Sequence, residues 1–278
     1  MIIKNRDRDA YSFANINLLG KCNANCYFCL GKDIADELAG KNQLATYFQE
    51  WKNFGTFLAM CEAKNINKLY LTGQTADGLQ YHYLEELVDY LQNDGFTVGV
   101  RTNGYLALRK MHIIQKMKGE IGYSIHSLEK KTSQHIMYCQ FMPDWNKIIP
   151  QSGDNVRVSV VVNRFNVDEI EGIVGYLSKF DNVRYIQLRR ISTETRYKRL
   201  EYDILLFEKF YEDFKEKHAP TGEYAGAPIY RLFGKDVVFW RTVETRANSL
   251  NYFTDGTCSD EYFVVEGYLK YSKKETGK

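Results

Sequence analysis

Three cysteines stand close together near the start of the chain and offer the clearest chemistry in the sequence. Cys22, Cys26 and Cys29 are separated by three and two residues, and the chain holds only six cysteines in 278 residues. Thiolates so close on one loop suit an iron–sulfur cluster, because sulfur ligands favour soft metal centres. A [4Fe–4S] cluster is saturated by four cysteines, so three ligands leave one iron open to a reactive molecule. The alternatives are unpaired core cysteines or a zinc site, although zinc usually needs four ligands and no second cysteine pair follows.

This loop has a counterpart in a known superfamily. The spacing Cys22-x3-Cys26-x2-Cys29, with Phe28 just before the last cysteine, resembles the signature loop of the radical S-adenosylmethionine (radical SAM) superfamily. Over residues 13–190 the chain is similar to its molybdopterin-precursor-cyclase-like branch. The resemblance implies an enzyme that chelates S-adenosylmethionine at the open iron, beside Phe28. It further implies that a 5′-deoxyadenosyl radical abstracts hydrogen from a substrate, and that flavodoxin or ferredoxin donates the electron.

Alternating strands and helices must position this loop. The apolar run Ile16–Leu19 predicts a buried strand that ends just before the cysteines. Further strands are expected at 66–72, 96–101, 121–125, 156–162 and 183–188, and helices at 43–64, 79–93, 106–117, 167–180 and 202–217. A less regular helical region, broken at Pro143, is expected at 128–149. This alternation predicts a parallel sheet covered by helices, with ligands at the carboxyl ends of the strands. The resemblance implies a partial (β/α)6 barrel, although periodicity alone leaves a doubly wound sheet open.

The last part of the sequence changes character. We expect residues 1–218 to form the barrel and residues 219–278 to form a small β-rich extension that packs on it. Alternating apolar residues on both sides of Gly234-Lys235 and of Glu266-Gly267 predict two hairpins.

The turn after the second expected strand takes the place of a Gly-Gly-Glu-Pro-like turn in the superfamily. Gly73 matches the first glycine of that turn, whereas Gln74 and Thr75 depart from it. The resemblance implies that Thr72, Gly73, Gln74 and Thr75 receive the amino group of the cofactor through backbone and hydroxyl acceptors, with help from Asp77. The alternative is an ordinary loop between a strand and a helix.

Polar residues also end the later strands. Asn103 is expected near the cluster, Ser124 at the carboxylate or ribose of the cofactor, and Asn163 at its adenosyl part, as the resemblance implies. Ser124 and His126 alternate with apolar neighbours, so both should face the interior. His126 either contacts a ligand or is a satisfied core histidine, and the Asn103-Gly104 pair could form a turn alone.

Two arginines and two isolated cysteines complete the candidate residues. Arg189 and Arg190 end the sixth expected strand and could hold a substrate carboxylate or phosphate by paired hydrogen bonds. A solvated approach to the next helix is the alternative. Cys139 and Cys258 could donate a hydrogen atom to a substrate radical, or could be buried structural thiols. A second cluster is not expected, because only Cys258 follows residue 139.

Composition narrows the class of protein. The net charge of +2 does not indicate a nucleic-acid or membrane partner. The sequence has no signal-peptide core and no run of about eighteen apolar residues, so a cytoplasmic protein is expected. The expected substrate is small and anionic or nucleotide-like. A peptide-modifying enzyme, such as an epimerase or crosslinking enzyme, and a non-catalytic redox or activating protein are the alternatives.

Overall fold

One large sheet organises the chain. The computed structural model describes residues 11–193 and 195–272, and its strands follow the order β11-β10-β1-β2-β3-β4-β5-β6-β9-β8-β7. The strands are β1 (Tyr11–Leu19), β2 (Lys68–Gln74), β3 (Thr97–Thr102), β4 (Ile121–Ser124), β5 (Val156–Val161), β6 (Val183–Arg189), β7 (Gly222–Tyr224), β8 (Ala227–Leu232), β9 (Lys235–Trp240), β10 (Asn248–Phe253) and β11 (Cys258–Ser259).

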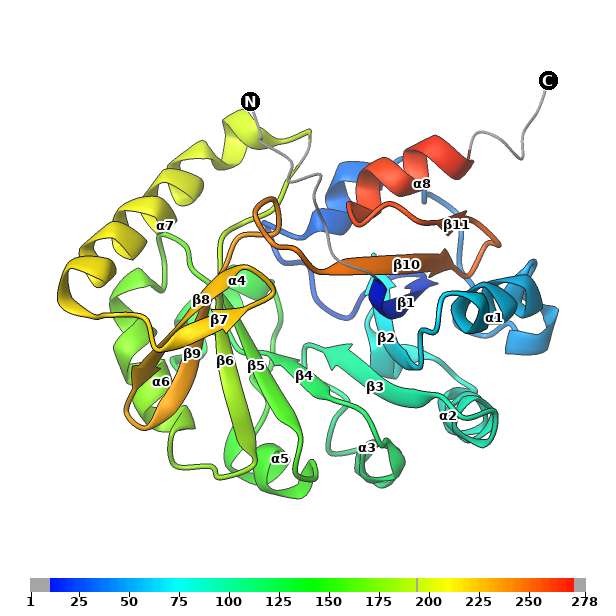
Figure 1. The fold of residues 1–278 in the computed structure, drawn as a ribbon, viewed down its shortest axis with the longest axis horizontal. Coiled ribbons are helices and arrows are strands. Elements are labelled where there is room, and N and C mark those ends of the chain that lie inside the picture. The colour runs from blue at the N-terminus through cyan, green and yellow to red at the C-terminus, as the bar shows by residue number, and fades with distance from the viewer. Residues whose placement is uncertain (1–10, 194, 273–278) are drawn as a thin grey trace.

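The centre of the sheet is parallel. Strands β1 to β6 pair with one another in chain order, β10 joins β1 and β9 joins β6, all in parallel. The edge strands β11, β8 and β7 are antiparallel. Figure 1 shows the central strands following one another along an arc. The predicted parallel α/β architecture is confirmed.

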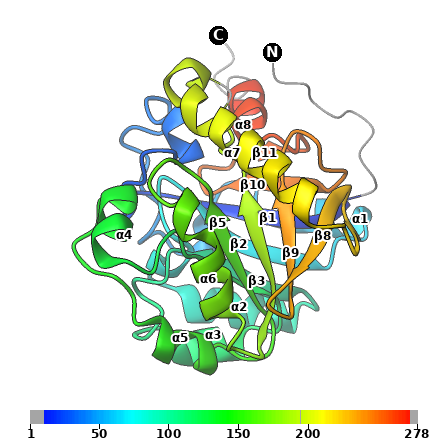
Figure 2. The same cartoon turned by 90° about the vertical axis from the view of Figure 1, so that its left-hand side faces the viewer.

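Helices follow the strands along the outer side of this arc (Figure 1). They are α1 (Phe54–Ala63), α2 (Leu84–Asn93), α3 (Met111–Lys116), α4 (Lys130–Met137), α5 (Trp145–Gln151), α6 (Ile170–Leu177), α7 (Tyr197–Lys217) and α8 (Val264–Ser272). Helix α7 covers β8 and β9, as Figure 2 shows, and Tyr211 packs on Phe239 with ring centroids 4.7 Å apart. None of the described helices is long and apolar enough to cross a membrane.

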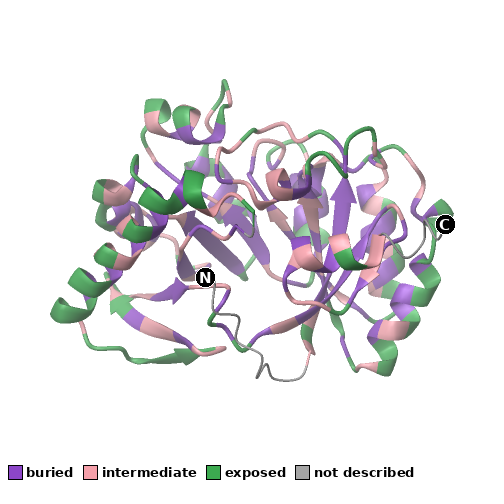
Figure 3. Cartoon of the chain, turned by 90° about the horizontal axis from the view of Figure 1, so that it is seen from above, coloured by how far each residue is buried: buried purple, intermediate pink, exposed green. Residues whose placement is uncertain are grey.

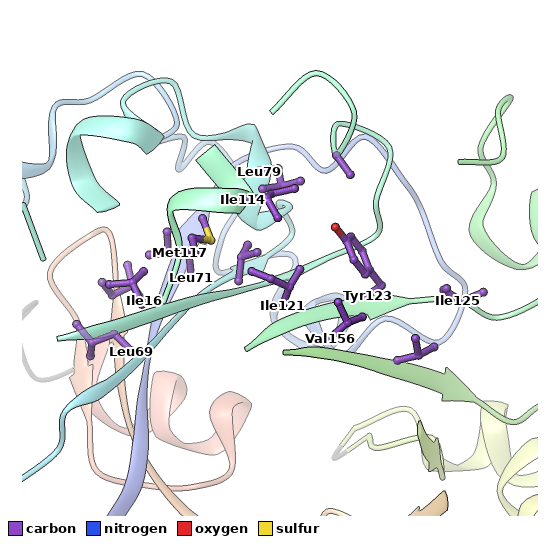
Figure 4. Close-up of a cluster of buried hydrophobic side chains, with 14 of the residues drawn as sticks. Ile16, Leu69, Leu71, Leu79, Ile114, Met117, Ile121, Tyr123, Ile125 and Val156 are labelled. Atoms are coloured by element: carbon purple, nitrogen blue, oxygen red, sulfur yellow. The ribbon is translucent and has the colours of Figure 1, made fainter. Parts of the chain in front are cut away.

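The two faces of the sheet carry different side chains because neighbouring residues of a strand point to opposite sides. Apolar residues of the outer face pack under the helices, and Figure 4 shows this cluster at Ile16, Leu69, Leu71, Ile121, Tyr123 and Val156. Figure 3 shows the strands mostly buried and the helices exposed along their outer sides. The register pairs Asn17 with Thr72, so polar residues follow the inner face.

Two predicted elements are wrong. The expected helix at 43–64 is helical only from α1 onward, apart from a short 3-10 turn at Phe48–Glu50. Asn53 has a left-handed backbone, with φ of 58°, and this conformation breaks a helix. The aromatic residues before it still join the core, because the rings of Trp51 and Phe54 lie 5.4 Å apart. Their spacing therefore imitated helical periodicity.

The second predicted hairpin, around Glu266-Gly267, is also wrong, because helix α8 occupies that segment. Glycine is a typical turn residue, but Gly267 serves another purpose. A Cβ at this position would lie 2.0 Å from Ser259 Oγ. The glycine thus permits close packing of α8 on β11 instead of a turn. The first hairpin, β8 with β9, is confirmed. Residues 219–272 share the sheet with β1 and β6, and the predicted division at residue 218 stays a prediction.

Candidate functional site

A cavity of about 360 Å³ lies at the carboxyl ends of the parallel strands. Most of the residues that the sequence singled out line it: Cys22, Cys26, Phe28, Cys29, Thr72, Gly73, Gln74, Asn103, Ser124, His126, Arg189 and Arg190. Within the described residues, four other candidates do not line it: Thr75, Cys139, Asn163 and Cys258.

The cysteine loop is fixed to the segment around the end of α4. The backbone N–H of Asn25 donates to the carbonyl of Met137 at 2.8 Å. The Cys139 thiol donates to the carbonyl of Asn23 at 2.9 Å. Cys139 therefore holds the loop in place from outside the cavity, and this contact favours the structural interpretation of that thiol.

A buried carboxylate ties the loop to the neighbouring strands. Asp77 accepts from the Asn103 N–H at 2.7 Å and from the Thr102 hydroxyl at 2.8 Å. Asn103 in turn donates from Nδ2 to Asn23 Oδ1 at 2.8 Å. Burial raises the pKa of Asp77, and these hydrogen bonds offset part of the rise. Asn103 thus lies near the cysteines, and its amide positions their loop.

The other side of the loop is held by an arginine at the start of α7. Arg196 donates to the carbonyl of Cys29 at 2.6 Å and to that of Tyr27 at 3.1 Å, and it forms an ion pair with Asp33. A basic residue after β6 is commonly part of a solvated charge run. Arg196 instead fixes the conformation of the loop, because it donates hydrogen bonds to the backbone carbonyls on both sides of Phe28.

The thiols themselves fit an iron–sulfur cluster. Cys22, Cys26 and Cys29 are free and face one cavity. Burial raises the pKa of Cys22 to about 12 and also raises that of Cys26, so both thiols keep their protons unless a bound metal stabilises the thiolates. Among the described residues no three metal-binding side chains converge on a single ion. A [4Fe–4S] cluster would place each of the three cysteines on a different iron.

The turn after β2 leaves one acceptor for a ligand. The Thr75 hydroxyl donates to the carbonyl of Gln74 at 2.6 Å and does not line the cavity, and the Asp77 oxygens already accept three hydrogen bonds. Gln74 Oε1 is buried and has no hydrogen-bond partner. A Cβ on Gly73 would lie 2.1 Å from the carbonyl of Ala76. Glycine is therefore required by the turn itself, whatever the turn binds.

His126 is a neutral side chain with a fixed tautomer. Its Nδ1 accepts from the Val161 N–H at 3.1 Å, so the proton is on Nε2. Burial, helped by the charge of Arg189, lowers its pKa to about 3. The ring lies edge-on to Phe28, with centroids 5.0 Å apart. His126 and Ser124 both line the cavity, as their alternation predicted.

The two arginines at the end of β6 differ. Arg190 donates to Glu208 at 3.2 Å and already has an anionic partner. Arg189 lies over the ring of Trp240, with its Cζ 6.0 Å from the centroid, and its Nη2 approaches Thr242 Oγ1 at 3.5 Å. Burial lowers the pKa of Arg189 to about 10, and the charge of Arg157 adds to this shift.

Two candidates have local roles. The amide of Asn163 donates to the carbonyl of Val161 at 2.8 Å and accepts from the Phe165 N–H at 3.0 Å. Its side chain therefore shapes the turn after β5 and does not line the cavity. Cys258 lies on β11 and packs against the main core. The placement of both residues favours structural roles.

Sequence reasoning missed three polar residues of the inner face. Asn15, Asn17 and Arg101 line the cavity, and Asn15 Oδ1 and Arg101 Nε are buried without a partner. Unsatisfied buried atoms are rare in proteins and commonly mark a ligand site. Asn15 and Asn17 alternate with buried apolar neighbours in β1, a pattern that predicts their inward placement, and Arg101 follows the buried Val100.

Comparison with known proteins supports the fold. No family model and no curated protein matches the sequence. The structure is similar to that of SuiB from Streptococcus suis, with a TM-score of 0.60, 13% identity, and coverage of 90% of this chain and 60% of SuiB. SuiB bound to S-adenosylmethionine and SuiB bound to the precursor peptide SuiA match with the same TM-score and coverage, at 12% and 11% identity. The chain thus shares the fold of SuiB and spans about 60% of its length.

Proposed function

We propose that this chain is a radical SAM enzyme that holds one [4Fe–4S] cluster on Cys22, Cys26 and Cys29. The observation that carries the proposal is that three free thiols face the same cavity as the polar ends of β1 to β6. A structure of the same fold, SuiB, has been solved with S-adenosylmethionine bound. Under this proposal, β1 to β6 and the helices that follow them form a partial (β/α)6 barrel.

The residues of the cavity would divide the work of binding. Bound at the cluster, S-adenosylmethionine would supply a 5′-deoxyadenosyl radical. Gln74 Oε1 is the free acceptor for the amino group of the cofactor, in place of the expected Thr75. His126 directs an Nε2–H donor toward the ligand, because Val161 occupies its other nitrogen. Asn103 and Arg196 keep the cysteines in place.

Hydrogen abstraction from a small anionic substrate is the first candidate reaction. Arg189 supports it, since this guanidinium faces the cavity without a carboxylate partner among the described residues. Peptide modification is the second candidate, and the observation in its favour is that SuiB has been solved with a precursor peptide. Flavodoxin or ferredoxin remains the proposed electron donor in both cases.

Anaerobic turnover tests the proposal. The reconstituted chain, given dithionite and S-adenosylmethionine, should form 5′-deoxyadenosine and methionine. Replacing Cys26 by alanine should abolish this product, whereas replacing Cys61, a buried cysteine outside the cavity lining, should not. Product formation that persists without Cys26 would contradict the proposal.

A further inference from the structure

Three arginines extend from strands β3, β5 and β6 onto the inner face of the sheet. Arg157 on β5 is neutralised, because it donates to Glu120 at 2.8 Å and to Gln187 Oε1 at 2.7 Å. Glu120 also accepts from the Tyr185 hydroxyl at 2.8 Å, so both of its oxygens are bonded. The nearest partners of this carboxylate are therefore Arg157 and Tyr185. The other two arginines, Arg101 on β3 and Arg189 on β6, form no ion pair among the described residues, so their positive charges need another source of stabilisation.

Arg101 forms no hydrogen bond or ion pair with a carboxylate in the part of the chain that the structure describes, and the charge of Glu120 acts on it only from a greater distance. Its Nε is buried without a hydrogen bond, and its Cζ lies 4.6 Å from the ring centroid of Tyr70 and 5.1 Å from that of Phe13. Burial lowers its pKa, and the charge of Arg157 adds to the effect. The two rings stabilise the cation from the side and leave its hydrogen-bond donors for a ligand.

Arg189 is the second arginine that lines the cavity. Apart from the 3.5 Å approach to Thr242, no hydrogen bond of its guanidinium is present among the described residues. The acidic side chain that lines the cavity, Asp77, is bonded to the turn and to β3. Two guanidinium groups therefore face one cavity, and neither is hydrogen-bonded to a carboxylate among the described residues. Keeping unpaired cations away from water is costly, and a bound anion would offset that cost.

We propose that Arg101 and Arg189 together bind an oxyanion of the substrate, a carboxylate or a phosphate, at the floor of the cavity. This inference rests on the proposed function and assigns the anion to Arg101 and Arg189, without the predicted Arg190. Arg101 and Arg189 also line a smaller cavity of about 50 Å³, which no cysteine lines, and we call this side of the main cavity its floor. The carboxylate of the cofactor is expected at the cluster, so the floor remains for the substrate.

Anion titration of the full reconstituted chain tests the inference. Inorganic phosphate and succinate are titrated separately at constant ionic strength against chloride, and the fluorescence of Trp240 beside Arg189 reports binding. Saturable binding of at least one probe is expected, and the Kd should rise about thirtyfold or more in Arg101→Met and in Arg189→Met. Arg190→Met is the matched control, because Arg190 is already paired with Glu208. Its Kd should not change.

Two further measurements separate the possible outcomes. The Tm of Arg101→Met should stay level or rise, since an unpaired buried cation is removed; a fall would indicate a structural arginine and overturn the inference. The affinity for S-adenosylmethionine should not change, and parallel weakening would assign the anion to the cofactor and overturn it as well. Equal anion binding by all variants, or no binding by the parent chain, would also overturn it. Anion binding in a chain that fails to cleave S-adenosylmethionine would contradict only the proposed function.

Discussion

The wall of the cavity that begins at β1 and β2 differs from the wall built on β3, β4 and β6. The first, here the cysteine wall, carries Cys22, Cys26 and Cys29 together with the unpaired acceptor of Gln74. The second, the arginine wall, carries Arg101, His126 and Arg189, which offer N–H donors. A ligand that spans the cavity must therefore present donors to one wall and acceptors to the other. Under the proposed function, the cofactor meets the cysteine wall and the substrate anion meets the arginine wall.

The largest expected effect on stability distinguishes Arg157, which is paired with Glu120, from Arg101, which forms no ion pair among the described residues. Arg157→Met leaves Glu120 buried without its ion-pair partner, which should cost about 3–5 kcal/mol of unfolding free energy. Arg101→Met removes a cation that forms no ion pair among the described residues, so its unfolding free energy should stay level or rise. Urea denaturation of both variants measures the difference, and equal costs would contradict the assignment of Arg101 to a ligand.

A pH titration sharpens the description of His126. Its pKa is about 3 in the folded chain against 6.5 for an ordinary histidine, so the unfolded chain binds its proton first as the pH falls. Stability contributed by the neutral ring is therefore present above about pH 6.5 and is lost progressively toward pH 3. Between pH 8 and pH 5 this loss should amount to about 2 kcal/mol. Denaturation curves of His126→Gln should lack that component, and an identical pH dependence would contradict a buried neutral ring.

The acceptor of the cysteine wall is tested by cofactor affinity. Gln74→Leu removes Oε1 at similar volume, and the Kd for S-adenosylmethionine should rise about tenfold, as for one hydrogen bond to a charged group. Thr75→Val is the control, since the Thr75 hydroxyl donates to its own turn. Equilibrium binding to the reconstituted chain distinguishes them. A larger effect at Thr75 than at Gln74 would restore the acceptor that the sequence predicted.

The smallest effect is expected behind the cysteine wall. Cys139→Ala removes one hydrogen bond to Asn23 and should lower stability by about 1 kcal/mol. The variant should keep its iron and its formation of 5′-deoxyadenosine, and so should Cys258→Ala. Loss of substrate turnover with intact cleavage of S-adenosylmethionine would instead favour a thiol that donates hydrogen.

Much of the fold could be predicted because alternation of strands and helices is a local signal. The parallel order of β1 to β6 followed from it, and so did the inward placement of Ser124 and His126. The failures arose where tertiary contact decides the conformation. Gly267 is suited to a turn, but its lack of a side chain permits contact with Ser259 within a helix. A sequence pattern carries no trace of that neighbour.

The candidate site was predictable in position but not in its hydrogen bonds. Strand ends located the cavity, whereas the partners of each side chain come from distant parts of the chain. Arg189 and Arg190 look equivalent in the sequence, and only the fold brings Glu208 to Arg190. In the sequence Asp77 likewise resembles a carboxylate that is free to bind the cofactor. In the fold it accepts hydrogen bonds from Thr102 and Asn103.

The cluster is the central claim, and iron analysis tests it most directly. Iron and acid-labile sulfide are measured in the anaerobically reconstituted chain and in the alanine variants of Cys22, Cys26, Cys29 and Cys139. The account predicts about four irons and four sulfides per chain, retained in Cys139→Ala and lost in each of the other three variants. A content near eight irons, or full retention of iron after replacement of Cys22, Cys26 and Cys29 together, would contradict it.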